Sequence, residues 1–382
     1  MVNLQRITFS RLRTLAIENG VTLVAAVTRN QLTSDLASHL QALERWQEQG
    51  FAGEMGYMNR PSASFDVNVS LPQFQSIISI GIPYYRGEFP PAPAGYGRIA
   101  RYAWGRDYHR VVKRLLRPFI SALAAELQSV RALDWRLYTD AAPLLERAIA
   151  SIGSMGFIGK NTMLIRPGTG SYFFLAEIIC DVRVEHDETG ESAPLTKGRC
   201  GACVRCIERC PTGAIVSPGV LDGRRCISYL TIEKRTSFNE WEAAALGDWI
   251  FGCDVCQEVC PFNHQDVQVD DRSPFGGDGS VGPYLKLKEV FELQDKQQFE
   301  RRFAGTPLMR AKREGLIRNA ACVAANTGFT AAISDLLSLF RNDPSAMVRE
   351  QARASLAALA HYAIGFEHRQ IKAILGSTEN MV

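Results

Sequence analysis

Eight of the ten cysteines lie between residues 200 and 260, and their spacing constrains the fold more than any other feature of the chain. A first group follows the pattern C-x-x-C-x-x-C-x-x-x-C-P, and a second follows C-x-x-C-x-x-x-C-P with one more cysteine upstream. Two-residue gaps let successive thiolates reach different irons of one cube, whereas a cysteine followed by proline turns toward a second cube. The spacing predicts a ferredoxin-like module with two four-iron four-sulfur clusters.

The pattern also predicts which cysteines share a cluster. We assign one cluster to Cys200, Cys203, Cys206 and Cys260, and the other to Cys226, Cys253, Cys256 and Cys210. Zinc is the alternative, because paired C-x-x-C motifs also make zinc sites. The long first run joined to a second Cys-Pro half favours clusters. We expect the two remaining cysteines, Cys180 and Cys322, to be buried as small hydrophobic residues.

Length and composition are those of a soluble protein with a substantial core. The chain has 382 residues, 46% of them apolar and 22% charged, and a net charge of +3 that is too small to indicate a partner. Two or three domains are expected. We find no apolar stretch of bilayer length and no N-terminal signal-peptide pattern. Cysteines spaced as metal ligands fit a reducing compartment, so we expect a cytoplasmic protein without membrane association.

The hydrophobic pattern predicts a multidomain α/β (α+β) chain. Residues 1–195 form an α/β domain, in which helices are expected at 4–18, 31–48, 107–127 and 143–150, and strands at 76–83, 135–138 and 171–180. Residues 196–265 form the ferredoxin-like module, and the acidic, Gly-rich residues 266–282 a linker. Residues 283–382 are expected to be helical. Segments 307–325 and 344–360 share a weak basic-then-apolar pattern, which predicts a HEAT-like domain.

Three segments of the α/β domain carry candidate functional residues. Residues 98–117 are basic and partly aromatic, which suits a cofactor pocket or a nucleic-acid groove, or else a solvated helix face. We expect the aromatic part, 102–109, to belong to a site and the part from Arg110 onward to be a solvated face. The Gly-rich segment 153–162 lacks the ending of a Walker loop, so it is either a point of close backbone approach or a plain tight loop.

Asp140 follows a predicted strand and precedes a predicted helix. Strand ends that face a crevice are where α/β domains place chemistry, so Asp140 is a candidate general acid. Capping the following helix is the alternative role, and position alone favours the cap.

Taken together, these segments closely resemble epoxyqueuosine reductases. The resemblance rests on the segments 101–109, 139–140, 156–161, 225–231 and 252–257 and on both cysteine motifs. It covers nearly the whole chain. The cysteine half is shared with many redox proteins, whereas its combination with the N-terminal segments is specific to this family.

The resemblance implies an activity, cofactors and partners. The family reduces epoxyqueuosine to queuosine at the wobble position of tRNA, which is the last step of queuosine synthesis. It implies a cobalamin in the N-terminal domain, close to one of the two 4Fe-4S clusters, and an external electron donor. A monomer is the expected state, since the sequence contains no evident coiled coil.

The resemblance also assigns roles to residues. Asp140 matches the family's proton donor, which outweighs the cap interpretation. Tyr102, Asn161 and Ser228 lie in family-like segments and are assigned to cobalamin. The family's arginine before the strand at residue 76 is replaced here by Ser64, and the nearest arginine, Arg60, is assigned in its place. Basic residues of the C-terminal helices are assigned to tRNA, because helical repeats offer extended surfaces for RNA phosphates: Arg310, Lys312, Arg313 and Arg318.

Two other functions compete with this one. A cobalamin-dependent reductive dehalogenase acting on small molecules would share both kinds of cofactor, but would have no need of a basic helical C-terminus. A non-catalytic electron carrier would use its large domain only to dock another protein.

Overall fold

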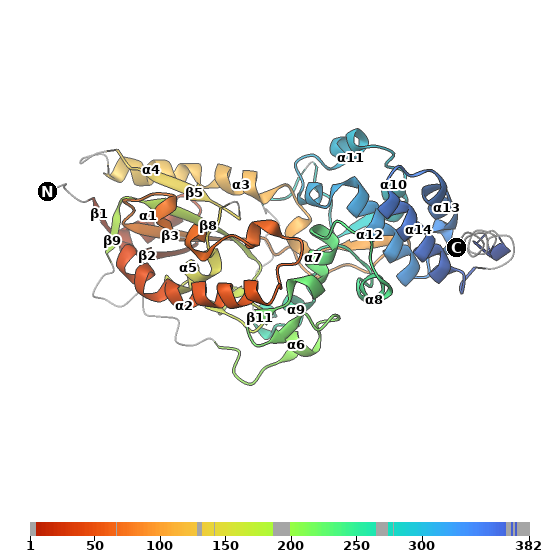
Figure 1. Cartoon of the computed structure of the whole chain (residues 1–382). Coiled ribbons are helices and arrows are strands. Elements are labelled where there is room, and N and C mark those ends of the chain that lie inside the picture. Colours follow the sequence, from red (N-terminus) through yellow and green to blue (C-terminus); the bar gives the residue numbers. More distant parts are fainter. Residues whose placement is uncertain are drawn as a thin grey trace. The chain divides into compact units, whose positions relative to one another are not determined.

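The computed structural model describes residues 5–65, 67–127, 132–140, 142–185, 199–264, 274–277, 279–363, 368–369 and 371–372. The chain divides into two compact units (Figure 1). Unit 1 consists of Met1–Arg86, Tyr108–Asp222 and Val255–Pro274, and unit 2 of Gly87–Asp107, Gly223–Asp254 and Phe275–Val382. The linear boundaries expected from the sequence do not coincide with these units, because the chain crosses between them several times. Residues 266–273 and 278 of the expected linker lie outside the described residues.

Unit 1 is built on a four-stranded antiparallel sheet with the order β2-β3-β8-β5, formed by Leu23–Thr28, Ser76–Pro83, Phe173–Cys180 and Trp135–Tyr138. The central strands β3 and β8 are almost wholly apolar, because both faces of the sheet are covered. Their register sets Ile77 opposite Ile179 and Ile78 opposite Ile178, which alternates the isoleucines between the two faces. The predicted strands are confirmed, apart from two residues at the start of β8, and β2 was missed.

Helices cover both faces of this sheet (Figure 1). α2 (Arg29–Glu48) and α5 (Glu146–Ile152) share a core with Ile77 and Ile179 on one face, and α3 (Tyr108–Leu115) and α4 (Arg117–Leu127) lie on the other. α2 begins at a capping box between Thr28 and Gln31. The helix expected at residues 4–18 is shorter, because Arg6–Thr8 form β1, which pairs with β9 (Arg183–Glu185), and α1 (Phe9–Glu18) starts after it.

The cysteine segments of unit 1 form short elements. Before them in the chain, β6 (Phe157–Ile158) and β7 (Leu164–Ile165) pair to form a small hairpin. The first cysteine group leads into α6 (Arg205–Glu208) and the β10–β11 pair (Ile215–Ser217 and Val220–Leu221), and the second into α9 (Val255–Glu258) and η6 (Pro261–Asn263). α6 packs against α9, which brings segments from the two halves of the motif together.

Unit 2 combines a small sheet with helices. The sheet has the order β12-β4-β13, formed by Trp249–Phe251, Tyr96–Ile99 and Tyr284–Lys286, which explains why residues 87–107 and 223–254 belong to the C-terminal unit. The helices are α7 (Ile227–Ile232), α8 (Glu240–Ala245), α10 (Leu287–Phe291), α11 (Lys296–Phe303), α12 (Lys312–Asn326), α13 (Ile333–Asn342) and α14 (Ala346–Leu359). Short 3-10 turns occur at Gly56–Met58, Ser62–Phe65 and Val67–Val69 in unit 1 and at Arg101–Ala103, Gly223–Arg225, Pro307–Ala311 and Thr330–Ala332 in unit 2.

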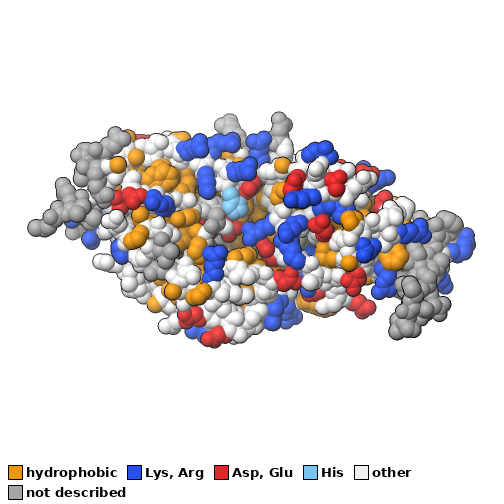
Figure 2. All heavy atoms as spheres, turned by 45° about the horizontal axis from the view of Figure 1, so that its top comes forward, with side chains coloured by type: hydrophobic (Ala, Val, Ile, Leu, Met, Phe, Trp, Pro, Cys, Tyr) orange, Lys and Arg blue, Asp and Glu red, His pale blue; other side chains and the backbone are white. Residues whose placement is uncertain are grey.

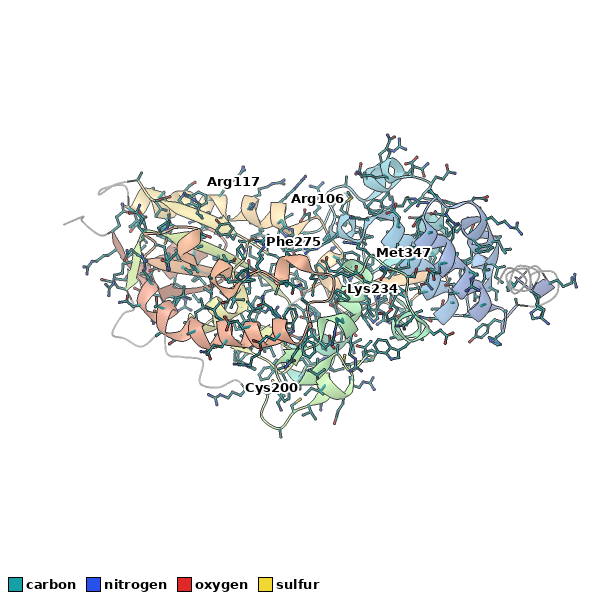
Figure 3. The ribbon with its side chains drawn as sticks, viewed as in Figure 1. Arg106, Arg117, Cys200, Lys234, Phe275 and Met347 are labelled. Atoms are coloured by element: carbon teal, nitrogen blue, oxygen red, sulfur yellow. The ribbon has the colours of Figure 1, made fainter. Side chains whose placement is uncertain are left out.

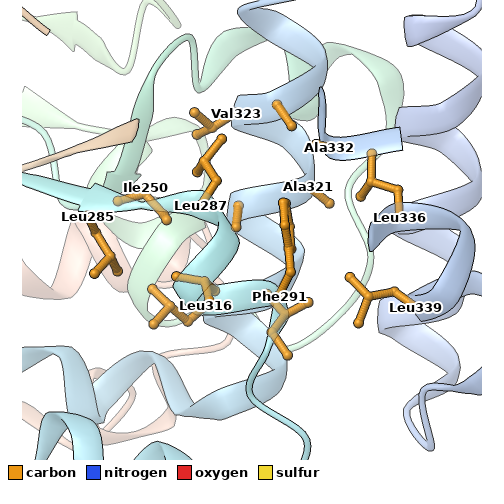
Figure 4. Close-up of a cluster of buried hydrophobic side chains, with 14 of the residues drawn as sticks. Ile250, Leu285, Leu287, Phe291, Leu316, Ala321, Val323, Ala332, Leu336 and Leu339 are labelled. Carbon is orange, nitrogen blue, oxygen red and sulfur yellow. The ribbon is translucent and has the colours of Figure 1, made fainter. Parts of the chain in front are cut away.

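The core of unit 2 surrounds α12, which is buried along most of its length. Leu316, Ala321 and Val323 of α12 pack with Ile250 of β12 and with side chains of β13, α10 and α13 (Figure 4). Among the described residues, no helix combines the length and apolar character that crossing a bilayer requires.

Candidate functional site

Asp140 lies just beyond the end of β5 and presents its carboxylate toward solvent. Its side chain is 56% exposed, and its Oδ2 accepts a hydrogen bond of 2.5 Å from the hydroxyl of Tyr108. The backbone of Asp140 has a φ of +50°, a conformation that residues other than glycine adopt only at a cost in free energy. A non-glycine residue held in this conformation marks a place where the surrounding structure fixes the backbone.

Glu146 helps to hold the backbone of Asp140 in this conformation. Its Oε1 accepts a hydrogen bond of 2.7 Å from the backbone N–H of Asp140. The alternative that Asp140 caps the following helix is wrong, since α5 begins at Glu146 with Leu145 in the cap position and no side-chain cap. The carboxylate of Asp140 therefore does not serve as the cap of α5.

Tyr108 is itself held in place by aromatic contacts. Its ring stacks on Phe174 of β8 at 4.3 Å between ring centroids and on His109 at 4.2 Å. The Nε2 atom of His109 lies 4.0 Å from Oδ2 of Asp140. The aromatic part of segment 102–109 thus reaches the predicted acid through its last two residues.

Two carboxyl groups of unit 1, those of Glu146 and Glu177, have pKa values above the ordinary value for glutamate. Burial, and then the charge of Asp140, raises the pKa of Glu146 to about 7. Burial also raises the pKa of Glu177 in β8 well above its ordinary value, and Ser79 donates a hydrogen bond of 2.5 Å to this carboxyl group. Glu146, which holds a proton near neutral pH, therefore lies beside the exposed Asp140, and its charge in turn raises the pKa of Glu177.

The Gly-rich segment 153–162 runs from the end of α5 into the turn of the β6–β7 hairpin, where Lys160 contacts the first cysteine group. The backbone N–H of Lys160 lies 3.4 Å from Sγ of Cys200, and its Nζ donates to the carbonyls of Gly201 (2.8 Å) and Cys203 (3.0 Å). Cys200 lies at the start of the segment that leads to α6 (Figure 3). Of the two predicted explanations, close backbone approach is the right one, and the partner is the cysteine loop.

Unit 1 brings together the four cysteines of the first predicted set. Burial, and then the charge of Cys200, raises the pKa of Cys206, and Cys260 and Cys203 add to this effect. Burial likewise raises the pKa of Cys260, with contributions from Cys200 and Cys203. Across the described residues, no three His, Cys, Asp or Glu side chains converge on a single ion.

The second predicted set draws on both units. Cys210 and Cys256 belong to unit 1, whereas Cys226 and Cys253 belong to unit 2. Burial tends to raise the pKa of Cys210, but hydrogen bonds from Thr212, Ala214 and Ile215 outweigh it and lower that pKa, as a thiolate ligand requires. The grouping of these four cysteines remains a prediction. Cys180 and Cys322 are buried as expected, and burial raises the pKa of each thiol to about 12.

The residues assigned to cobalamin are likewise divided between the two units. Arg60 and Asn161 lie in unit 1, and Tyr102 and Ser228 lie in unit 2. Asn161 is 4% exposed and joins two segments of unit 1, because its amide donates to the carbonyl of Cys256 (3.2 Å) and accepts from the N–H of Met163 (3.2 Å). Arg60 is exposed, and Tyr102 and Ser228 are half-buried.

The assignment to tRNA is wrong for two of the four basic residues, because their side chains are buried. Arg318 is 0% exposed, donates to the carbonyls of Leu230, Lys234 and Thr236, and lies over the ring of Phe238. Arg313 is 4% exposed and forms an ion pair of 2.5 Å with the buried Asp343. A guanidinium group enclosed in the core cannot reach an RNA phosphate.

The other two lie at the surface of unit 2. Arg310 is partly exposed and pairs with Glu233 at 2.7 Å. Lys312 lines a pocket of about 210 Å³ together with Lys234, Arg235 and Met347, and Lys234 and Met347 lie near one another in Figure 3. This basic pocket remains compatible with a polyanion.

Neither the role of Glu146 nor that of Lys160 has a clear signal in the sequence. Glu146 comes six residues after Asp140 and resembles an ordinary first-turn acid of α5. Lys160 is a single cation in the Gly-rich segment 153–162. Both roles depend on contacts between segments that no local pattern predicts.

Comparison with known proteins gives consistent results. A family profile described as "Epoxyqueuosine reductase QueG, DUF1730" matches residues 65–141, and one described as "4Fe-4S double cluster binding domain" matches residues 199–263. An epoxyqueuosine reductase of Xanthomonas campestris pv. campestris is 37% identical over 354 residues, which cover 91% of this chain and 95% of that protein. One of Synechocystis sp. is 37% identical over 283 residues, covering 73% and 93% of the two chains.

Solved structures extend the similarity to the fold. A Bacillus subtilis epoxyqueuosine reductase, described with a catalytic aspartate loop swung out of the active site, is 26% identical with a TM-score of 0.78 and covers 92% of this chain and 90% of its own. An epoxyqueuosine reductase with a tRNA-Tyr epoxyqueuosine-modified stem loop is 25% identical with a TM-score of 0.77, covering 94% and 95% of the two chains.

Proposed function

The chain belongs to the epoxyqueuosine reductase family of oxidoreductases, and we propose that it reduces the epoxide of epoxyqueuosine in tRNA to the alkene of queuosine, with Asp140 as the proton donor. The relative solved with an epoxyqueuosine-modified stem loop supports tRNA as the substrate. The dehalogenase and electron-carrier alternatives find no support among the relatives. The observation that carries the assignment of Asp140 is its solvent-facing carboxylate, held by Tyr108.

The reaction sets the tasks of the site. Removing an epoxide oxygen as water consumes two electrons and two protons. Iron–sulfur clusters deliver electrons one at a time, and the 4Fe-4S domain of this chain provides that function. The oxygen must be protonated as its bond to carbon breaks, since an alkoxide is a poor leaving group. A positioned carboxylic acid is a suitable donor for this step.

Asp140 and its neighbours supply the proton. The protonated carboxyl group of Asp140 donates to the epoxide oxygen, and the hydroxyl of Tyr108 then hydrogen-bonds to the carboxylate that remains. Glu146 accepts from the Asp140 backbone and fixes the direction in which the side chain points. The Bacillus subtilis relative, with its catalytic aspartate loop swung out, suggests that a loop of this kind can leave the site. The +50° φ of Asp140 suits a loop whose closed position is held by such contacts.

Cobalamin is proposed as the second cofactor. When bound, it supplies a low-valent cobalt centre that reduces one carbon of the epoxide. Each unit offers polar groups of a kind that suits the amide edge of a corrin: within unit 2, Tyr102 and Ser228 have half-buried hydroxyls, and within unit 1, Arg60 has an exposed guanidinium. Asn161 fits less well, because its amide joins the hairpin to Cys256.

The remaining expectations complete the proposal. The surface residues Arg310 and Lys312, on a C-terminal unit that we interpret as HEAT-like, contribute to tRNA binding. An external donor reduces the clusters. We expect a monomer that works in the cytoplasm, where tRNA is modified.

Replacement of Asp140 tests the proposal. Anaerobically purified Asp140→Asn should contain the same iron, sulfide and cobalt as wild type and should fail to reduce tRNA carrying epoxyqueuosine. Asp134→Asn is a matched control, since Asp134 also lies near β5 in unit 1 but pairs with Arg136 at the surface. Full turnover by Asp140→Asn would exclude the proton-donor role, and wild-type protein without activity on this RNA would exclude the function itself.

A further inference from the structure

One face of α3 and the start of α4 carries a stripe of four basic residues. Arg110, Lys113, Arg114 and Arg117 are all exposed, and their spacing of three, one and three residues places them on the same side of a helix. The opposite side is apolar and buried, with Val111, Val112 and Phe119. We refer to these four residues as the α3 stripe.

The stripe is one continuous surface, although α3 and α4 are separate helices. The N–H of Leu116 bonds to the carbonyl of Val112 at 3.0 Å, and the N–H of Ile120 bonds to the carbonyl of Leu116 at 2.9 Å, so helical bonding continues through the junction. Seven residues of helix span about 10 Å. Arg117 extends away from its helix (Figure 3), and Lys and Arg side chains gather along the face of unit 1 that carries α3 and α4 (Figure 2).

The charge of the stripe is uncompensated by the parts of the chain that the structure describes. None of its four side chains forms an ion pair with a described carboxylate, and the sequence has no Asp or Glu from residue 108 to residue 125. Other exposed arginines of unit 1 do have partners, such as Arg6 with Glu185 and Arg11 with Glu126. Like charges three and four residues apart destabilise a helix, so the stripe is not explained by helix stability.

The position of the stripe connects it to the site. The same helix begins at Tyr108, whose hydroxyl bonds to Asp140, and Arg110 follows two residues later. A polyanion bound along the stripe would therefore pass close to the acid. Arginine and lysine side chains of this kind contact the phosphates of nucleic acids and fix their position without reading sequence.

We propose that the α3 stripe binds the phosphate backbone of the RNA whose modified base is reduced at Asp140. This inference rests on the proposed function, which supplies RNA as the polyanion. The stripe would hold two or three phosphates beside the reacting nucleotide, whereas Arg310 and Lys312 of unit 2 would contact other parts of the RNA. Segment 110–117, expected from the sequence to be only a solvated face, becomes part of the interface.

Direct binding measurements test the proposal. The variant carries Arg110→Gln, Lys113→Gln, Arg114→Gln and Arg117→Gln, and the control, matched in charge, carries Arg6→Gln, Arg11→Gln, Arg136→Gln and Arg183→Gln. Fluorescence anisotropy with an unmodified tRNA-Tyr anticodon stem loop gives Kd over a series of salt concentrations. The stripe variant should bind roughly 10- to 100-fold more weakly at about 0.1 M salt, and its salt slope should fall by about 2, since each lost phosphate contact removes about 0.7.

Three results would overturn the proposal. The first is an unchanged Kd and salt slope in the stripe variant. The second is an equal loss of affinity in the control, which would indicate a simple effect of net charge. The third is a stripe variant that retains RNA binding but loses binding to anionic phosphatidylserine vesicles. Iron content and circular dichroism of each variant verify the fold. Because the assay uses unmodified RNA and no turnover, its outcome is independent of whether wild-type protein reduces epoxyqueuosine.

Discussion

The hydroxyl of Tyr108 donates a 2.5 Å hydrogen bond to Oδ2 of Asp140, which joins the first residue of α3 to the loop after β5. The two residues are 32 positions apart in the sequence, and the stacking of Tyr108 on Phe174 fixes the geometry from the side of the sheet. A hydrogen bond to a carboxylate stabilises its charged form. This pair therefore both orients the proposed acid and stabilises the carboxylate left after proton transfer.

Removing the hydroxyl of Tyr108 should slow the reaction. Tyr108→Phe keeps the ring that stacks on Phe174 and His109, but loses a hydrogen bond to a charged group, which contributes about 1.5–3 kcal/mol. We expect kcat to fall roughly 10- to 100-fold with KM and cluster content unchanged. Single-turnover kinetics on modified stem loops provide the measurement, and a wild-type kcat would show that the bond has no part in the chemical step.

Glu146 should make the stability of unit 1 depend on pH. The pKa of its carboxyl group is about 7 in the folded protein, above the ordinary value of 4.5. The folded state therefore holds the proton more tightly, and this contribution is complete below about pH 4.5 and disappears as pH rises to about 7. The loss amounts to at most about 3 kcal/mol.

The variant Glu146→Gln isolates this effect, since an amide oxygen still accepts from the N–H of Asp140 but does not titrate. Relative to wild type, its Tm should rise between pH 5 and pH 7.5 by roughly 5 °C or more. Glu177 titrates in both proteins, but the charge of Glu146 contributes to its raised pKa, so the difference between the two Tm curves includes the coupling of these two carboxyl groups. Parallel Tm curves over this range would mean that Glu146 does not carry the raised pKa.

Lys160 should tune the first cluster. Its ammonium group bonds to the carbonyls of Gly201 and Cys203, so it places a positive charge beside the cysteine loop. Positive charge favours the reduced, more negative cluster, and Lys160→Met should lower the reduction potential by on the order of 20–60 mV. Lys160→Arg, which keeps the charge, is the control. A potentiometric titration followed by electron paramagnetic resonance measures the shift, and equal potentials in all three proteins would contradict this role.

Buried and exposed arginines of unit 2 should respond differently to mutation. Arg318→Met leaves the buried carbonyl of Leu230 and two partly buried carbonyls without their donor, and should lower stability by about 3 kcal/mol without changing the RNA affinity of the folded protein. Arg310→Gln with Lys312→Glu should lower RNA affinity about 10-fold or more, with a smaller loss of stability than Arg318→Met, because the ion pair between Arg310 and Glu233 lies near the surface. Thermal unfolding and anisotropy on the same samples separate the two outcomes. Lost affinity in folded Arg318→Met would restore that residue to the interface.

The sequence predicted those elements of the fold whose signals are local. The strand Ser76–Pro83 has its observed bounds, since a run of apolar residues ending in proline is a sufficient signal. β2 was missed, although Leu23–Thr28 is also apolar and pairs with β3 along its whole length. The basic residues of 310–318 resembled one surface, but α12 is enclosed by its neighbours, so Arg313 and Arg318 are interior ion-pair and hydrogen-bond partners.

The sequence alone determined that this chain holds iron–sulfur clusters and belongs with the epoxyqueuosine reductases, because thiolate spacing within a short loop and motif residues are properties of neighbouring positions. Only the tertiary structure decided that Tyr108 and Glu146 hold Asp140, that Lys160 contacts the cysteine loop, and which arginines are exposed. Those relationships join residues distant in sequence. They depend on how helices and strands pack, and packing depends on the whole core.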